Sequence, residues 1–401
     1  MPKIIFINRF FFPDHSATSQ LLSDLAFDIV GISPDILVVT SRQRYDDPES
    51  RLERAETING VKVRRIWTTT FGRGRLLGRV VDYLTFYTSA FWVLLLVVER
   101  NDIVVAKTDP PLISVIAAVV VRLRRARLVN WVQDIFPEVA SALGVGGIGI
   151  FLRVLRGLRN YSLRRAEKNV VLGARMAEKV IEQGIEENSV EIIHNWADGE
   201  CIKSLPADEN PLRAAWGLSH KFVVGYSGNM GRAHDFETIV EAAKLLKGET
   251  NIFFLFVGDG ARREWLQGRV RELGLNRVMF KPYQARDQLS QSLGVADVHL
   301  ISLYPQLEGY IVPSKFYGIA AAGRASIFIG DINGEVPEIL KLGKCGKAFA
   351  LGQAQALADY IKELSHDRTT TSETGANARI LFEEKFDKGK ALAAWHTVLQ
   401  L

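Results

Sequence analysis

Short apolar runs rich in β-branched residues alternate with longer segments of helical periodicity along the chain. In the first half, seven such runs predict strands: residues 3–8, 36–40, 61–66, 103–106, 127–132, 169–172 and 190–193. Most of these runs are apolar throughout, which is typical of strands covered on both faces by helices. Between the first two runs, apolar residues recur on one helical face: Leu21, Leu22, Leu25, Ile29 and Val30. The pattern predicts a parallel sheet with crossover helices.

The alternation is interrupted once. Residues 197–220 contain Asp, Glu, Pro and Gly, as a linker would, and strands are again predicted after them at 222–226, 252–257, 277–281, 297–302 and 325–329. A chain of 401 residues exceeds what one core usually serves, so two α/β domains are expected. We place them at residues 1–198 and 199–386 and expect a final helix, 387–401, to pack back on the N-terminal domain.

Each half predicts a Rossmann-like, doubly wound unit, and the expected fold class is α/β with two such domains facing each other across a cleft. In sheets of this kind, ligands bind at the carboxyl ends of the strands. Candidate chemistry is therefore expected in the loops that follow the predicted strands.

Composition narrows the range of functions. The two cysteines, Cys201 and Cys345, match no ligand spacing, which suits a reducing cytoplasm and argues against a disulfide framework or structural zinc. The chain runs from Met-Pro-Lys directly into an apolar segment, so no signal peptide is expected. No zinc spacing or basic-aromatic module favours nucleic acid as a partner.

Positive charge is concentrated in the first part of the chain. Residues 1–180 contain 26 Lys and Arg against 17 Asp and Glu, a difference of +9, whereas the remainder contains 24 against 28, a difference of −4. The excess indicates a surface that meets anions such as a phospholipid, a pyrophosphate or nucleic acid. Solvated arginines on helix faces explain it about equally well.

Two apolar stretches raise the question of membrane contact. Residues 83–98 are uncharged but number sixteen, fewer than the roughly 20 needed to span a bilayer, and residues 110–121 are fewer still. Arginines surround both stretches and recur on a third helix: Arg73, Arg75, Arg79, Arg122, Arg124, Arg125, Arg127, Arg153, Arg156, Arg159, Arg164 and Arg165. Basic faces beside aromatic residues suit peripheral binding to an anionic membrane. The alternative for 83–98 is a buried helix packed on the sheet.

The first candidate site is the sequence Tyr-Ser-Gly-Asn-Met-Gly-Arg at 226–232, directly after a predicted strand. Gly228 and Gly231 allow the backbone to approach a ligand, and the next helix offers free N–H groups to phosphate. Arg232 can neutralise a diphosphate, with Asn229 beside it. A tight turn without a ligand explains the glycines equally well.

The second candidate site is residues 308–318. It begins with Glu308, whose carboxylate can accept hydrogen bonds from sugar hydroxyls, and continues through Tyr310. It ends at a predicted helix start, where Ser314 and Lys315 would offer N–H groups and an ammonium to phosphate. An ordinary loop with a solvated lysine is the alternative.

An ordered series of motifs resembles the retaining glycosyltransferase family 4, which has the two-domain GT-B fold. The series is Ser227-Gly228-Asn229, Val257-Gly258-Asp259-Gly260, Ala296-Asp297-Val298, Pro313-Ser314-Lys315, Ala322-Gly323 and Pro337-Glu338. Within the family, the chain is most similar to bacterial enzymes of capsule and O-antigen assembly of the fucosamine-transferase type. Three further segments are similar to that group: residues 12–18, 134–138 and 194–198.

The resemblance implies transfer from a nucleoside-diphosphate sugar to a lipid-linked or saccharide acceptor, with retention and without a required metal or cofactor. A uridine diphosphate donor with an N-acetylated sugar and a location at the cytoplasmic face of the membrane are further expectations. The sequence contains no Asp-x-Asp pair to hold a divalent ion between diphosphate oxygens. Arg232 and Lys315 would then stabilise the departing diphosphate, and Glu308 would orient the donor sugar.

The chain departs from the family pattern at three places. Asn229 and His234 stand where many members have an Arg–Lys pair, so Arg232 is expected to replace the arginine. Gly318 stands where many members have a ribose-binding Glu. Gln133 precedes Asp134 where a His-Asp pair is common.

Asp134 is expected to act as a base toward the acceptor or to position it, the alternative being to cap a turn. His15 and Ser16, in the loop after the first strand, are further acceptor-side candidates with Gln133. Asp259 and Tyr283 are candidates near the nucleotide. Two other functions stay open: a nucleotide-sugar epimerase on the same scaffold, and a non-catalytic membrane-associated binding protein.

Overall fold

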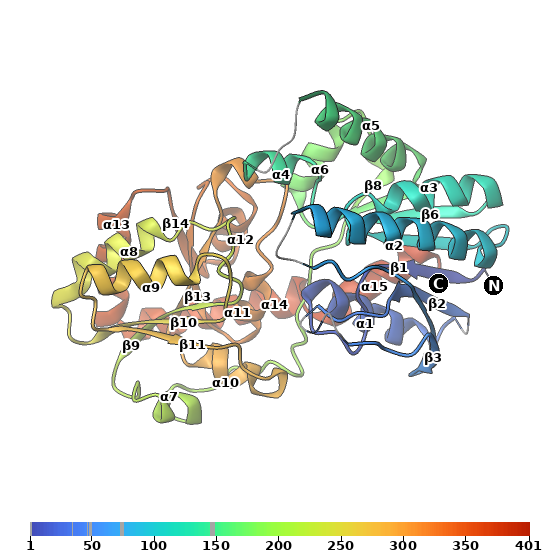
Figure 1. Cartoon of the computed structure of the whole chain (residues 1–401). Coiled ribbons are helices and arrows are strands. Elements are labelled where there is room, and N and C mark those ends of the chain that lie inside the picture. Colours follow the sequence, from blue (N-terminus) through green and yellow to red (C-terminus); the bar gives the residue numbers. More distant parts are fainter. Residues whose placement is uncertain (1, 34, 46, 48–49, 73–75, 145–148) are drawn as a thin grey trace. The chain divides into compact units, whose positions relative to one another are not determined.

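The structure is a computed structural model, and it describes residues 2–33, 35–45, 47, 50–72, 76–144 and 149–401. The chain forms two compact units (Figure 1): unit 1 comprises Met1–His194 with Leu392–Leu401, and unit 2 comprises Asn195–Ala391. The sequence placed the boundaries after residues 198 and 386, whereas the structure places them after 194 and 391.

Unit 1 contains an eight-stranded sheet in the order β3-β4-β2-β1-β5-β6-β7-β8. Its strands are β1 Ile4–Ile7, β2 Ile36–Ser41, β3 Ala55–Ile58, β4 Val61–Ile66, β5 Ile103–Lys107, β6 Arg127–Trp131, β7 Lys168–Val171 and β8 Val190–Ile192. All neighbours are parallel except β3, which pairs antiparallel with β4 at the edge. The expected doubly wound sheet is confirmed, and among the described strands of unit 1 the edge strand β3, largely exposed, was the one not predicted.

The helices of unit 1 are α1 Ala17–Ile29, α2 Leu76–Val97, α3 Ile113–Arg124, α4 Glu138–Ala142, α5 Gly149–Arg165, α6 Ala174–Ile181 and the 3-10 turn Glu187–Ser189. Helix α15, Lys388–Leu399, begins in unit 2 and enters unit 1 at Leu392. There Trp395 packs on Trp131 with ring centroids 4.6 Å apart, and His396 contacts Asp28 of α1 at 2.7 Å. The end of the chain is thus part of the first unit's core (Figure 1).

Helix α2 is longer than the apolar stretch that the sequence suggested. It has 22 residues, and its segment Leu77–Val97 is long and apolar enough to cross a membrane by length and composition. The expectation that this element is too short to span was therefore wrong as a statement about length. One face of α2 packs into the core through Phe86, Ala90 and Leu94.

Unit 2 contains a six-stranded sheet in the order β11-β10-β9-β12-β13-β14, and every pair is parallel. Its strands are β9 Phe222–Ser227, β10 Ile252–Val257, β11 Val278–Lys281, β12 Val298–Ser302, β13 Ala325–Ile329 and β14 Gly346–Phe349. Its helices are α7 Pro211–Ala215, α8 Glu237–Leu245, α9 Arg263–Glu272, α10 Leu289–Gly294, α11 Lys315–Ala321, α12 Glu335–Gly343, α13 Ala354–His366 and α14 Arg368–Lys385. Short 3-10 turns lie at Leu246–Gly248, Arg286–Gln288 and Pro305–Leu307.

The expected linker 197–220 is instead a packed part of unit 2. Arg213 of α7 is 2% exposed and forms a two-point ion pair with Asp297, at 3.1 and 3.0 Å. Asp297 also accepts a hydrogen bond from the backbone of Val223 at the start of β9. This motif aspartate therefore ties α7 to the amino-terminal edge of the sheet and lies away from the loops that follow the strands.

Candidate functional site

Two glycine loops meet at the carboxyl-terminal edge of the unit 2 sheet, after β9 and β10. Gly228 and Gly258 have φ of 121° and 131°, values that side-chain-bearing residues rarely adopt. A Cβ on Gly258 would lie 2.2 Å from the carbonyl oxygen of Gly228, so the two backbones touch. The N–H groups of Asn229 and Gly231 donate no hydrogen bond within the described part of the chain. The loops thus offer a close backbone approach and free donors at one place.

Lys315, the first residue of α11, lies beside these loops. Its Cε would be 3.0 Å from a Cβ on Gly228, and its Nζ lies 5.2 Å from the ring centre of Tyr226. Among the described residues, no carboxylate forms an ion pair with Lys315. Burial lowers the pKa of Lys315 to about 8, so the amine is still mostly protonated at pH 7. An unpaired, partly desolvated ammonium is suited to an anion.

His234 holds this ammonium in place. The Nζ of Lys315 lies 3.1 Å from Nε2 of His234, and Nδ1 of His234 lies 2.5 Å from the carbonyl oxygen of Ser302. Burial, with the neighbouring lysine, lowers the pKa of His234 to about 3, so the imidazole is neutral. Nδ1–H then donates to Ser302 and Nε2 accepts from Lys315. The sequence noted His234 only as a departure from the family and missed this positioning role.

Glu308 has a local partner in the structure. Its Oε1 accepts a hydrogen bond from the backbone N–H of Glu335 at 2.8 Å, at the start of α12. A Cβ on Gly334 would lie 2.5 Å from Oε2, so the loop is closely fitted around the carboxylate. Burial raises the pKa of Glu308. Near it in sequence, Tyr310 is half-buried and Ser314 is exposed.

The other donor-side candidates differ in their surroundings. Tyr283, 57% exposed, has a ring atom 3.3 Å from the position of a Cβ on Gly258, so it lies beside the glycine loops. Asp259 is exposed and lies 3.7 Å from Arg263. Arg232 is exposed and makes no hydrogen bond or ion pair with any described residue. The structure therefore places Lys315 and Tyr283 against the loops, and Arg232 follows Gly231 in the first loop with an exposed side chain.

A second group of polar residues follows β5 and β6 in unit 1. The hydroxyl of Thr108 accepts from the backbone N–H of Gln133 at 3.0 Å and hydrogen-bonds to Asp134. Oδ1 of Asp134 is buried and has no hydrogen-bond partner among the described residues. Burial, followed by the negative charge of Asp109, raises the pKa of Asp134 to about 7. Asp134 can therefore exchange a proton near neutral pH.

Three residues that the sequence did not single out lie in the same part of unit 1. The Arg9 guanidinium lies 5.2 Å from the ring centre of Tyr83 and 3.8 Å from Asp82. Lys107, at the end of β5, is buried, donates to the carbonyl of Thr18 at 3.0 Å, and lies 3.5 Å from a tryptophan ring centre. Burial lowers the pKa of Lys107 and raises that of Tyr83. The sequence held one signal for Lys107, because a cation ends a strand that is otherwise apolar.

The first loop of unit 1 is held locally. Oδ1 of Asp14 accepts hydrogen bonds from the backbone and the hydroxyl of Ser16, at 2.8 and 2.5 Å. The Ser16 hydroxyl is therefore engaged within the loop. The side chain of His15 is exposed, and its carbonyl accepts from Gln20.

Two of the arginines expected on the basic surface of α5 share one carboxylate. Arg159 is 7% exposed and forms two hydrogen bonds to Glu138, at 3.0 and 3.1 Å, while Arg156 lies 3.2 Å from the same carboxylate. Arg127 pairs with Glu167. The expectation that Arg153, Arg156 and Arg159 together form a lipid-facing stripe is wrong for Arg159, which is buried against α4. Of the arginines expected before α2, Arg73 and Arg75 lie outside the described residues.

Comparison with known proteins accounts for both units. Residues 31–196 match the family described as "Glycosyl transferase 4-like domain", and residues 208–380 match "Glycosyl transferases group 1". The crystal structure of HepE from Anabaena in complex with UDP-glucose is similar over 100% of both chains, with a TM-score of 0.75 and 20% identity. The chain belongs to the GT-B glycosyltransferases. The expected fold class is confirmed, with the glycine loops and Lys315 in the group 1 half of this GT-B chain.

Two relatives are similar in sequence to this GT-B chain. WbjE of Pseudomonas aeruginosa, named as a glycosyltransferase, is 28% identical over 270 residues, 66% of each chain. WcaI of Escherichia coli K12, named for glycosyl transfer in colanic acid biosynthesis, is 27% identical over 223 residues, 54% of each chain. The chain therefore covers less than two thirds of the length of either relative.

Proposed function

We propose that the protein transfers a sugar from a nucleoside-diphosphate sugar to a lipid-linked or saccharide acceptor during assembly of a surface polysaccharide. Membership of the GT-B glycosyltransferases supports sugar transfer. The polysaccharide context is supported by the colanic acid assignment of WcaI, and a uridine diphosphate donor by the complex of HepE with UDP-glucose. The N-acetylated sugar rests on the family resemblance alone.

The observation that carries the proposal is the surroundings of Lys315. An ammonium that no described carboxylate pairs with is held by a neutral His234 and lies against two loops whose glycines admit close approach. The free N–H groups of Asn229 and Gly231 lie in the first of these loops. A diphosphate supplies the charge and the acceptor oxygens that such a group of donors requires.

In the proposed reaction, the diphosphate leaves as the bond from the sugar C1 to the β-phosphate oxygen breaks. Lys315 stabilises the charge that develops on this oxygen, and the backbone N–H groups share it. We propose that the reaction proceeds with retention and without a required metal, with Arg232 and Glu308 as additional donor-side residues. The proposal for Glu308 requires that the carboxylate contacts the sugar while it binds the start of α12.

On the acceptor side, we propose that Asp134 takes up the proton of the acceptor hydroxyl or positions it. A carboxyl with a pKa of about 7 can be ionised before transfer and protonated after it. His15, Ser16 and Gln133 are proposed to contribute to acceptor binding, although Ser16 would do so through its loop. We also propose a peripheral location on the cytoplasmic face of the membrane.

The test is donor binding followed by turnover. The protein is titrated with UDP-, GDP-, ADP- and dTDP-sugars, and a rise in melting temperature identifies the nucleotide that it binds. The same donor is then incubated with and without a lipid-linked acceptor, and release of the nucleoside diphosphate is measured. Acceptor-dependent release supports transfer, whereas epimerised donor without acceptor would establish an epimerase. Donor binding without either reaction would indicate a binding protein.

A further inference from the structure

Helix α2 presents an apolar face to solvent. Only 22% of its most apolar 18-residue stretch is buried, and its outer face carries Leu77 at 79% and Leu96 at 72% exposure. Leu84 and Trp92 lie between them on the same face, also exposed. A contiguous apolar strip of this length is uncommon on the surface of a water-soluble monomer. It indicates a surface that meets an apolar phase.

The helix is not free to cross a bilayer in this fold. Its other face carries Phe86, Ala90 and Leu94, which are fully buried in the core of unit 1. Near its start, buried Asp82 accepts hydrogen bonds from the Thr69 hydroxyl at 2.7 Å and from the Phe71 backbone at 3.0 Å. Spanning would expose a carboxylate and the core to lipid. An apolar face on a packed helix is instead suited to lying in the membrane interface.

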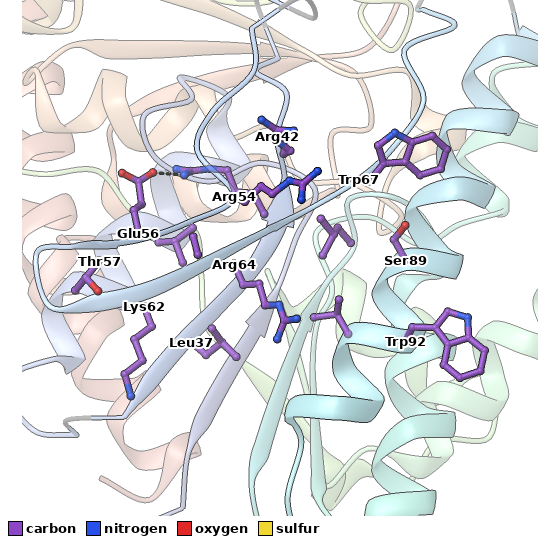
Figure 2. Close-up of a pocket in the computed structure, with 15 residues that line it drawn as sticks. Leu37, Arg42, Arg54, Glu56, Thr57, Lys62, Arg64, Trp67, Ser89 and Trp92 are labelled. Carbon is purple, nitrogen blue, oxygen red and sulfur yellow. Dashed lines mark hydrogen bonds and ion pairs between the residues drawn. The ribbon is translucent and has the colours of Figure 1, made fainter.

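A basic hollow adjoins this helix. It has a volume of about 1020 Å³, and α2 contributes Ser89, Trp92 and Val93 to its wall. The opposite wall comes from β3, β4 and the loops around them, with five cations and one acid: Arg42, Arg54, Lys62, Arg64, Arg65 and Glu56. Figure 2 shows Arg64 extending from β4 toward α2, with Trp92 on the helix. The lining charge is +5 − 1 = +4.

Two of these cations have no side-chain partner among the residues that the structure describes. Arg65 is paired with Glu56, Lys62 with Asp35, and Arg42 donates to the carbonyl of Leu52. Within the described part of the chain, the side chains of Arg54 and Arg64 make no hydrogen bond or ion pair. Glu56, the one acid among the described lining residues, is already paired with Arg65. The hollow therefore contains two guanidinium groups, those of Arg54 and Arg64, that are available to bind an anion.

Aromatic residues connect the hollow to the apolar face. Trp67, 63% exposed, and Trp92, 59% exposed, both line the hollow. Phe71, also exposed, contacts the start of α2, where its Cβ would lie 3.2 Å from a Cβ on Gly78. Indole rings at the boundary between charged and apolar surface are typical of residues placed at the level of lipid headgroups.

We propose that the hollow binds the phosphate of an anionic phospholipid through Arg54 and Arg64, while the outer face of α2 lies among the acyl chains of the same leaflet. Charge complementarity selects the phosphate, and the continuous apolar strip selects a bilayer over a polyanion in water. This inference rests on the membrane partner of the proposed function and replaces α5 by α2 as the contact.

The proposal is tested with the full chain and lipid vesicles. Co-sedimentation is measured with phosphatidylcholine vesicles and with vesicles in which a third of the lipid is phosphatidylglycerol. Arg54→Gln/Arg64→Gln should weaken binding to the anionic vesicles about 30-fold, the effect of two basic contacts at about a factor of five each. Leu84→Ser/Leu96→Ser should weaken binding to the same vesicles through the apolar face.

Matched controls separate this site from general charge. Arg271→Gln/Lys341→Gln removes two exposed positive charges of unit 2 that pair with no described residue, and it should leave vesicle binding within about twofold. A Trp92→Phe variant should lose most of the fluorescence quenching that brominated lipid causes in the wild type. All substituted side chains are exposed, and melting temperatures verify that the variants are folded.

Several results would overturn the proposal. Equal loss in the control pair, no loss in Arg54→Gln/Arg64→Gln, or loss only on replacing Arg153 would place the contact elsewhere. Binding of oligonucleotides in preference to anionic vesicles would assign the hollow to a polyanion. UDP-glucose binding is measured separately without vesicles, so the membrane site and the donor site can fail independently.

Discussion

Replacing Lys315 by methionine tests the donor site most directly. Methionine keeps an unbranched apolar stem against Gly228 and removes the ammonium that His234 holds at 3.1 Å. A hydrogen bond to a charged group contributes about 1.5–3 kcal/mol, and about 1.4 kcal/mol corresponds to a tenfold change in affinity. The Kd for UDP-glucose should therefore rise about 10- to 150-fold in Lys315→Met, measured by isothermal titration calorimetry.

The pH dependence of binding adds a signature that loss of packing would not produce. Burial lowers the pKa of Lys315 from 10.5 to about 8, so the free protein loses this charge as the pH rises through 8. A bound diphosphate favours the charged form and raises the pKa again. The affinity of the wild type should therefore be level below pH 8 and should fall above it, whereas Lys315→Met should show no such fall.

A matched control is Lys244→Met, which removes a lysine from the exposed side of α8, where it pairs with Glu241. It should bind UDP-glucose within about twofold of the wild type. The reasoning is refuted if Lys315→Met binds UDP-glucose as tightly as the wild type, or if it keeps the wild-type pH profile. Either result would remove Lys315 from the phosphate site.

Three further changes have defined outcomes. Asp134→Asn should abolish acceptor-dependent transfer while UDP-glucose binding persists. The pKa of Asp134 is raised to about 7, so the folded wild type binds more protons than the unfolded chain between about pH 4 and 7. The stability of the wild type therefore falls as the pH rises through that window, and melting curves of the variant should lack that fall. Gly258→Ala places a Cβ 2.2 Å from a backbone carbonyl oxygen, at a φ of 131°, and should lower the free energy of unfolding by about 2–3 kcal/mol in urea titrations. The control Gly268→Ala adds a Cβ in open space on α9 and should not lower the free energy of unfolding. Arg159→Ala leaves Glu138 buried without its main partner and should cost about 3–5 kcal/mol of stability by the same titration, so that intact stability would contradict the ion pair.

Most of the fold could be predicted from the sequence because its central strands are covered on both faces. Runs such as Ile4–Ile7 and Ile252–Val257 are apolar throughout, and such runs leave few alternatives. The strands that were not predicted, β3 and β14, lie at the edges of their sheets, where exposed polar residues weaken the pattern. The strand β3 forms only by pairing with β4, and the sequence of β3 alone does not reveal that contact.

Part of the candidate site could also be predicted from the sequence. Glycines after a strand and a lysine at a helix start have sequence signatures, so Gly228 and Lys315 could be named. The role of His234 could not, because it depends on a carbonyl 68 residues away at the end of β12. Arg159 was assigned to the surface because its partner, Glu138, lies 21 residues earlier and on another helix. Spacing along one helix indicates a shared face, but not which partner covers it.

The place of α15 has a consequence for how the chain is made. Trp131 is 1% exposed and Trp395 0% exposed, and each ring covers the other in the core of unit 1. A ribosome must synthesise all of unit 2, residues 195–391, before it reaches the tryptophan that completes unit 1. Unit 1 therefore emerges from the ribosome first but completes its core only after unit 2 has been synthesised. During translation unit 1 has an open indole surface that a chaperone can bind, and unit 2 can close its own core first.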